Sequence, residues 1–181
     1  MRLSAIAGIA AAIVCAVAPA VAQTPFRDVR WGFEVTLPDG WVGERADSDF
    51  TRAWFAGPDN AAMCGVTAVD EPSLAGDTQA EIDRRMASGA YNNEVADEHR
   101  RDGIEALSAR GWPVDHDGRK ALRGESVIIY EGVRVRAHKL LVAVPGRAYN
   151  VNCIAPDADF AKWEADIAAL IASFRVIKPV I

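Results

Sequence analysis

The sequence VIIYEGVRVRA, residues 127–137, predicts a β-hairpin around which the rest of the fold can be arranged. Two strand-like runs flank Glu131-Gly132, and a two-residue connection containing glycine suits a tight turn with positive φ. Pairing Tyr130 with Val133 then fixes the register. In that register the residues on one face are uncharged: Ser126, Ile128, Val135 and Ala137. The other face mixes apolar residues with arginines, so it is amphipathic.

Strands are also predicted on both sides of this hairpin. Residues 140–144 are wholly apolar, which is typical of a strand covered on both faces. Pro145-Gly146 reverses the chain into 149–153, where the alternation points the odd-numbered residues inward, Cys153 among them. Earlier in the chain, apolar alternation and short apolar runs bounded by turn residues predict strands over 31–37, 52–56 and 63–69.

A C-terminal helix is predicted to begin at Pro156-Asp157. Its apolar residues recur at helical spacing: Phe160, Trp163, Ile167, Leu170, Ile171 and Phe174. This stripe predicts that the helix docks on the sheet. A shorter helix is predicted to begin after Asp77 or Thr78, with Glu81 completing a capping box. The residues on its inner face are Ile82 and Met86.

A further helix is predicted over 94–110 from a thin apolar stripe, and the chain is expected to return to β structure after 111–113. Together these elements predict an α+β fold, an antiparallel sheet flanked by helices in the manner of an α/β/α sandwich. Residues 23–181 have the length of a single domain. We expect its polar, proline-containing start, 23–30, to be a flexible lead-in.

The first 22 residues have the order of a secretory signal peptide. Arg2 supplies the positive charge, residues 3–17 are a nearly unbroken apolar run, and Ala20-Val21-Ala22 is a cleavage motif before Gln23. The alternative is a retained anchor, but a membrane-spanning helix needs about 20 apolar residues. We therefore expect a mature chain in the periplasm or outside the cell, without stable membrane insertion after cleavage.

Composition and cysteine usage fit that location. The formal net charge of −5 argues against nucleic acid or an anionic membrane surface as the partner. Cys64 and Cys153 remain after cleavage, and an isolated pair in an exported protein predicts one disulfide. A redox couple is the alternative, but it would want the two thiols close together as C-x-x-C.

The sequence carries no recognisable catalytic, cofactor or metal-binding motif. The histidines fall in three separate segments: His99, His116 and His138. We therefore predict no metal site, no cofactor and no catalytic residue. Asp115-His116-Asp117 could clamp a cation or form an exposed turn beside Gly118, and the turn is the commoner arrangement. Three tryptophans are expected to serve in packing and not as a ligand cage: Trp41, Trp54 and Trp112.

Positive charge is concentrated around the hairpin. The basic residues are Arg134, Arg136, His138 and Lys139, with Arg119, Lys120 and Arg123 across the hairpin. One interpretation is a surface that binds a protein partner or an anionic ligand. The other is a solvated face whose charges prevent aggregation of the sheet. The candidate binding residues are Arg134, Arg136 and His138.

Two short motifs resemble the exported PsbP-like/DcrB-like α/β proteins. GFEVTLPDGW, residues 32–41, opens the predicted sheet, and IASFR, residues 171–175, ends the last helix. The order of the intervening elements is similar as well. The resemblance implies a central antiparallel sheet flanked by helices and an accessory or binding role. No functional residue carries over, and the cysteine pair is not a general mark of that group.

These observations predict an exported, non-enzymatic accessory or binding protein that acts through a sheet face. The alternative is a periplasmic enzyme or enzyme inhibitor whose site is assembled only in three dimensions. A deep pocket with convergent polar groups would favour the alternative, and a shallow, charged sheet face would favour the binding protein.

Overall fold

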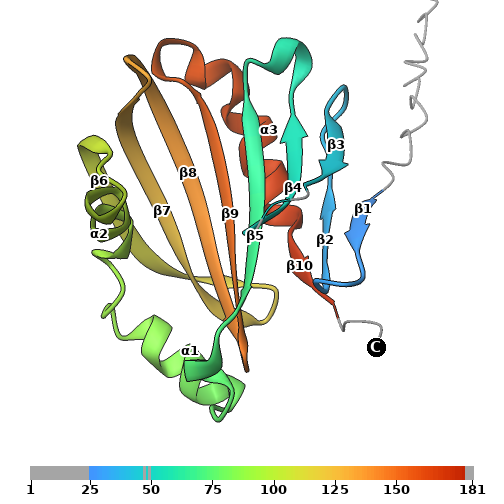
Figure 1. Cartoon of the computed structure of the whole chain (residues 1–181), viewed down its shortest axis with the longest axis vertical. Coiled ribbons are helices and arrows are strands. Elements are labelled where there is room, and N and C mark those ends of the chain that lie inside the picture. The colour runs from blue at the N-terminus through green and yellow to red at the C-terminus, as the bar shows by residue number, and fades with distance from the viewer. Residues whose placement is uncertain (1–24, 47, 49, 178–181) are drawn as a thin grey trace, which may run out of the picture.

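The computed structural model describes residues 25–46, 48 and 50–177, so the predicted signal peptide and its cleavage site lie outside the described residues. The described chain is α+β, with two antiparallel sheets and three α-helices (Figure 1). The large sheet has seven strands, in the spatial order β3 (Val42–Arg45), β4 (Thr51–Ala56), β5 (Met63–Asp70), β9 (Arg147–Pro156), β8 (Val133–Val144), β7 (Arg119–Tyr130) and β6 (Glu105–His116). The small sheet contains β1 (Pro25–Asp28), β2 (Phe33–Thr36) and β10 (Arg175–Val176).

The predicted hairpin is confirmed in its register. Tyr130 pairs with Val133, and Ile128 pairs with Val135. Glu131 and Gly132 both have positive φ, at 50° and 77°, as the two-residue turn requires. The same strands extend well beyond the predicted segment, because β7 and β8 are each 12 residues long.

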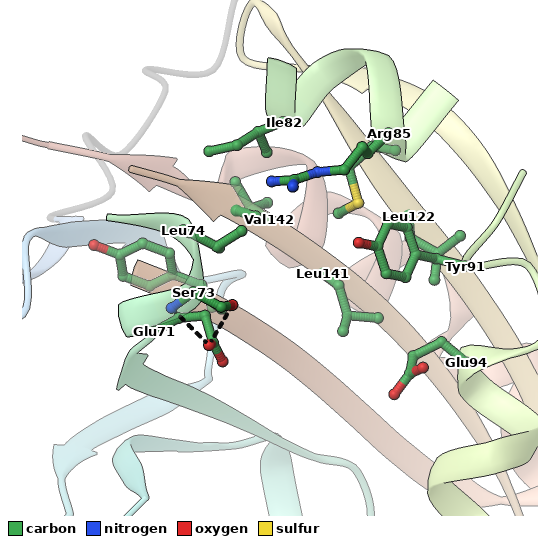
Figure 2. Close-up of a pocket in the computed structure, with 14 residues that line it drawn as sticks. Glu71, Ser73, Leu74, Ile82, Arg85, Tyr91, Glu94, Leu122, Leu141 and Val142 are labelled. Carbon is green, nitrogen blue, oxygen red and sulfur yellow. Dashed lines mark hydrogen bonds between the residues drawn. The ribbon is translucent and has the colours of Figure 1, made fainter. Parts of the chain in front are cut away.

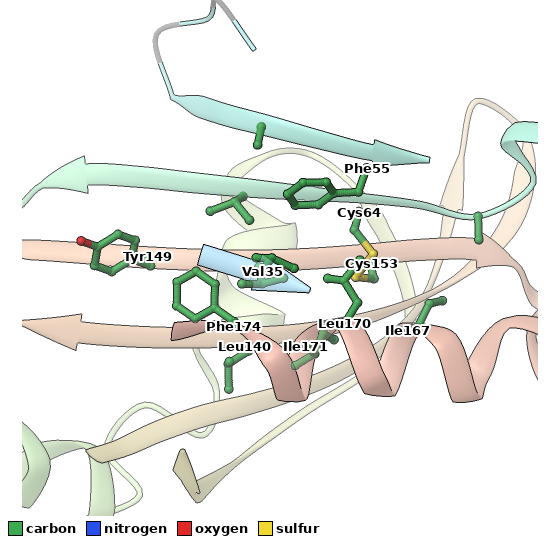
Figure 3. Close-up of a cluster of buried hydrophobic side chains, with 14 of the residues drawn as sticks. Val35, Phe55, Cys64, Leu140, Tyr149, Cys153, Ile167, Leu170, Ile171 and Phe174 are labelled. Carbon is green, nitrogen blue, oxygen red and sulfur yellow. A yellow bond between two sulfur atoms is a disulfide. The ribbon is translucent and has the colours of Figure 1, made fainter. Parts of the chain in front are cut away.

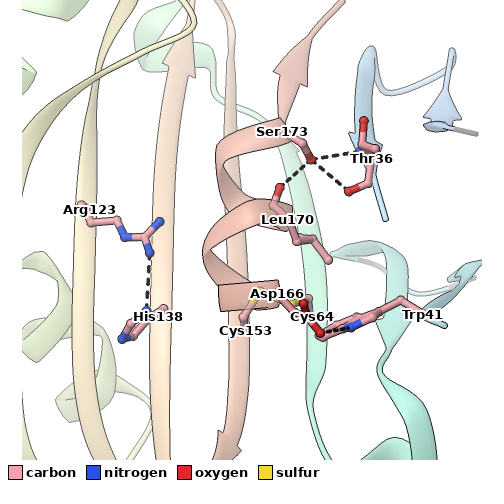
Figure 4. Close-up of a disulfide and its surroundings, with 9 residues drawn as sticks. All are labelled: Thr36, Trp41, Cys64, Arg123, His138, Cys153, Asp166, Leu170 and Ser173. Atoms are coloured by element: carbon pink, nitrogen blue, oxygen red, sulfur yellow. Dashed lines mark hydrogen bonds between the residues drawn. A yellow bond between two sulfur atoms is a disulfide. The ribbon is translucent and has the colours of Figure 1, made fainter. Parts of the chain in front are cut away.

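One face of the large sheet, here called the core face, is covered by α3 (Phe160–Ser173) and the small sheet. The predicted stripe of α3 is buried, and Ile167 and Leu170 are completely inaccessible (Figure 3). Ser173 ties this helix to β2, because its hydroxyl accepts a 2.9 Å hydrogen bond from the Thr36 N–H (Figure 4).

The predicted disulfide lies within this core. Cys64 on β5 and Cys153 on β9 are directly paired across the sheet, with Cα atoms 4.0 Å apart, and their sulfurs are bonded (Figures 3 and 4). Both cysteines are fully buried. The inward alternation predicted for 149–153 is also confirmed, because Tyr149, Val151 and Cys153 are all buried.

The opposite face, here called the helix face, carries α1 (Gln79–Ala87) and α2 (Glu94–Arg101) over β6, β7 and β8. The capping box of α1 is present between Thr78 and Glu81, and Ile82 and Met86 are buried as predicted. Helix α2 approaches the sheet closely at Gly124. A Cβ atom there would lie 2.6 Å from Cγ2 of Val95, so glycine makes this contact possible.

The helix predicted over 94–110 is wrong beyond its first half. The helix ends at Arg101, Gly103 has a φ of 68°, and β6 begins at Glu105. The β structure expected after 113 therefore begins earlier, and 111–113 lie within β6. The stripe was too thin to bury a helix of that length, whereas an edge strand pairs with β7 along most of its length. Pro113 is tolerated there because an edge strand has one side without ladder partners.

Part of the expected flexible lead-in over 23–30 is a strand instead. Residues 25–28 form β1 and pair with β2, so that Phe26 lies opposite Val35. The ring of Phe26 lies 5.1 Å from that of Phe55 in an edge-on arrangement, which gives this strand an apolar anchor. The described residues contain no helix that is both long and apolar enough to cross a membrane.

Three short 3-10 helices complete the described elements. They are η1 (Pro58–Asn60), η2 (Pro72–Leu74) and η3 (Asp157–Asp159). The last of these leads directly into α3, so the predicted start of the C-terminal helix at Pro156-Asp157 begins with a 3-10 turn.

Candidate functional site

Two of the three candidate binding residues are held together by one carboxylate. Asp157 accepts Arg134 Nε at 2.7 Å through one oxygen and Arg136 Nη2 at 2.9 Å through the other. The arginine side chains are 59% and 42% exposed, whereas that of Asp157 is 14% exposed. Arg136 also lies over the ring of Phe160, with 5.2 Å from Cζ to the ring centroid. The first residue of η3 therefore fixes both arginines in position.

Apolar residues are exposed at the same end of the sheet. Tyr130 and Val133, which pair across the turn, are each about half exposed, and so is Leu107 at the irregular pairing of β6 with β7. Tyr130 and Val133 share the helix face with Ser126, whereas Arg134 and Arg136 project to the core face, where Asp157 lies. The hairpin surface is our name for the five residues that surround the end of the hairpin from both faces: Leu107, Tyr130, Val133, Arg134 and Arg136. Aromatic residues and arginine are enriched in protein interfaces, so this composition suits a protein partner.

The third candidate, His138, does not reach this surface. It is buried beside Phe160, with 4.6 Å between the ring centroids. Burial lowers the pKa of His138, and the positive charge of Arg123 lowers it further. Arg123 donates a 3.4 Å hydrogen bond to Nδ1 of this ring, which fits a neutral imidazole (Figure 4).

The other basic residues near the hairpin lie away from the hairpin surface or pair with acidic residues. Lys139 points to the helix face, where its buried Nζ pairs with Glu98 at 2.8 Å. Arg119 pairs with Asp117, and Lys120 pairs with Asp115. The basic residues that are close in sequence therefore do not form one cationic patch. Alternate residues of a strand face opposite sides of the sheet, and several of these residues have acidic partners.

A buried Ser–His contact lies beneath α2. The Nε2 atom of His99 is 2.9 Å from Oγ of Ser126, and both residues are only 3% exposed. Burial lowers the pKa of His99, and the charge of Lys139 adds to this effect. Nδ1 of His99 is buried and has no hydrogen-bond partner among the described residues. The pair lacks both access and an orienting group, so its evident role is to seat α2 on the sheet.

The segment Asp115-His116-Asp117 ends β6 and enters the turn to β7, and its histidine contacts Phe174 at the end of α3. Asp117 and Gly118 form the turn between β6 and β7 with φ of 50° and 73°. His116 is half-buried, and its Nε2 donates to the Phe174 carbonyl at 2.8 Å. Burial lowers the pKa of this histidine as well. No group of three or more potential metal ligands lies together anywhere in the described residues.

The three tryptophans expected to serve in packing each have neighbours of their own. Trp41 is buried against Trp163 and donates its indole N–H to Asp166 at 3.2 Å (Figure 4). Trp54 covers Gly65 on the helix face, where a Cβ atom would lie 2.8 Å from the indole. Trp112 is partly exposed and carries Arg110 over its ring. Each tryptophan is thus engaged in packing with its own neighbours.

A cavity of about 310 Å³ lies between α1 and the helix face of the sheet (Figure 2). Its floor comes from β7 and β8, its roof from α1, and its sides from η2 and the segment before α2. The lining is mainly apolar: Leu74, Ile82, Met86, Leu122, Leu141 and Ala143. No sequence motif indicated this cavity, because its walls come from segments that are distant along the chain.

Comparison with known proteins identifies the architecture. No protein-family model and no curated protein matches the sequence. Among solved structures, cyanobacterial PsbP (CyanoP) from Synechocystis sp. PCC 6803 superposes with a TM-score of 0.55 at 17% identity, covering 87% of this chain and 95% of CyanoP. The chain has a PsbP-like fold.

The PsbP-like fold also relates the chain to two other solved proteins. LpqN, involved in cell envelope biogenesis of Mycobacterium tuberculosis, has a TM-score of 0.53 at 11% identity over 86% of each chain. The Ran-binding protein Mog1p of Saccharomyces cerevisiae has a TM-score of 0.50 at 10% identity, covering 86% of this chain and 96% of Mog1p. At these identities the likeness establishes the PsbP-like fold and transfers no functional residue.

Proposed function

We propose that this protein is an exported, non-enzymatic accessory or binding protein that docks a protein partner on the hairpin surface. The observation that carries the proposal is the pair of exposed arginines fixed by Asp157 at the end of a hairpin whose other face exposes Tyr130 and Val133. A fixed pair loses less side-chain entropy on binding than two free arginines would. Tyr130 and Val133 add apolar area that a partner can cover.

Two further considerations support this proposal. The order of charged, apolar and small residues at the N-terminus supports export to the periplasm or beyond. LpqN is involved in cell envelope biogenesis and Mog1p is a Ran-binding protein, so the proteins with this fold include one that binds a protein partner. The paired charges of the hairpin favour a partner of mixed charge over a simple anion.

The enzyme or inhibitor alternative has less support. The cavity under α1 has a mainly apolar lining, and its charged residues already have partners within the chain. The buried Ser126–His99 contact is closed to substrate. Neither arrangement supplies the convergent, accessible polar groups that acid–base or nucleophilic catalysis needs.

The proposal can be tested with immobilised mature protein and a periplasmic extract. We expect the unmodified chain to capture a stoichiometric partner and Arg134→Glu to reduce that capture by at least several-fold. Arg100→Glu is the matched control, because Arg100 is also an exposed arginine with one carboxylate partner, on α2. Equal capture by both variants would contradict docking on the hairpin surface.

A further inference from the structure

The cavity under α1 has the shape and lining of a small-molecule site. Ile82 of α1 lies on its roof, Leu122 and Leu141 on its floor, and Tyr91 at one side (Figure 2). Met86, also on α1, lines the cavity as well. It lies toward the opposite end of β8 from the hairpin surface, because its β8 residues are 141–143 and the hairpin surface takes 133–136. A ligand here would not compete with a partner docked on that surface.

The charged groups around the cavity already have partners within the chain. Arg85 forms an ion pair with Asp77, and Glu94 pairs with Arg101 at 2.6 Å. The Glu71 carboxylate accepts a hydrogen bond from the Ser73 hydroxyl at 2.7 Å. A charged ligand group would have to break one of these contacts or enter an apolar space without a partner, and burying an unpaired charge is costly.

The size and composition of the cavity narrow the ligand class further. A cavity of about 150 Å³ lined by aliphatic and aromatic side chains can hold benzene, and this cavity has a volume of about 310 Å³. It therefore has room for roughly two aromatic rings. The thioether of Met86 and the ring of Tyr91 are both favourable neighbours for an aromatic ligand.

We propose that this cavity binds a compact, uncharged, aromatic molecule of about two rings. The roof from α1, the floor from β7 and β8, and rim charges that are already ion-paired or hydrogen-bonded provide an apolar site that selects against charge. Small-molecule sites in proteins are commonly mainly apolar cavities of about 300–1,000 Å³.

Two fluorescent probes with the same ring system test the proposal. 1-Naphthylamine has two rings and is uncharged at neutral pH, whereas 5-aminonaphthalene-1-sulfonate adds one sulfonate to the same frame. We expect the purified mature protein to bind the uncharged probe saturably at one site, and the sulfonate at least tenfold more weakly. Equal or tighter binding of the sulfonate would overturn the inferred selectivity.

Two matched substitutions test whether the uncharged probe binds in this cavity. Ala148 lines the cavity, so Ala148→Phe should fill it and weaken binding of the uncharged probe at least tenfold. Val69, its neighbour across the β5–β9 pair, does not line the cavity, so Val69→Phe should leave the affinity within about twofold. Far-ultraviolet circular dichroism and the thermal midpoint verify that both variants fold. Unchanged binding in a folded Ala148→Phe protein, or no saturable binding by the unmodified chain, would overturn the site.

Discussion

At the scale of single residues, the absence of a side chain at position 124 determines how closely α2 can pack. Val95 is fully buried and occupies the space in which a Cβ atom of residue 124 would lie. Val95 belongs to the smaller of the two apolar clusters, together with Leu122, which lies two residues before Gly124. A close-packed site of this kind relaxes poorly when atoms are added.

We therefore expect Gly124→Ala to lower the free energy of unfolding by about 1–3 kcal/mol through overpacking. Urea denaturation measures this change. Gly76→Ala is the control, because nothing lies within 4 Å of a Cβ atom there, and it should be close to neutral. Adding Val95→Ala to Gly124→Ala should cost less than the sum of the single substitutions. Full additivity would show that the two side chains do not clash.

At the scale of elements, α2 is attached to the sheet through a small set of partly polar contacts. Val95 and His99 are its buried residues, and Glu98 adds the ion pair with Lys139. His99 is surrounded by Ser126, Lys139, Glu98 and Asp102. Burial and the nearby lysine outweigh the two carboxylates, so its pKa in the folded protein lies below the ordinary value.

The lowered pKa of His99 makes the folded protein less stable as the pH falls. The unfolded chain takes up a proton on this histidine at a pH near 6.5, whereas the folded chain does so only at lower pH. Stability is therefore highest at neutral pH and falls as the pH drops below about 6.5, until the folded pKa is passed. His116 and His138 contribute in the same direction.

We expect unfolding free energies measured between pH 7.5 and pH 5 to decrease, and His99→Gln to reduce that decrease. Hydrogen exchange provides the local readout, because amides of 94–101 should lose protection at a higher pH than those of α1. If the variant and the unmodified protein show the same pH dependence, protonation of His99 does not control the docking of α2.

At the scale of the whole molecule, the disulfide joins two central strands that are far apart in sequence. Cys64 and Cys153 are separated by 89 residues, and the strands that carry them meet near the middle of the large sheet. Closing a long loop restricts the unfolded chain more than the folded one, and loss of a native disulfide typically costs about 2–5 kcal/mol.

We expect protein recovered from the periplasm to have the mass of residues 23–181 less two hydrogens, and reduction to restore those hydrogens. Reduction should also lower the thermal midpoint, which scanning calorimetry measures. Free-thiol titration of the unfolded, unreduced chain is the control and should detect no thiol. Recovery of the uncleaved chain from the membrane would contradict export, and two reactive thiols would contradict the bridge.

Local sequence signals determined much of this architecture. The Glu131-Gly132 turn set the hairpin register, and Thr78 with Glu81 set the start of α1, because such turns and caps depend on residues a few positions apart. The long apolar stripe of α3 predicted its docking face for the same reason. The cysteine pair followed from there being two cysteines after the cleavage motif.

Tertiary structure decided what local patterns leave open. Residues 105–110 became an edge strand because pairing with β7 outweighed a thin helical stripe. The basic residues of β8 have separate environments. His138 is buried in the core, and Lys139 pairs with Glu98 of α2. Arg134 and Arg136 are held by Asp157. The cavity under α1 likewise exists only where distant segments meet. Burial, charge pairing and enclosed volume depend on contacts across the chain, so they are fixed only when the elements pack together.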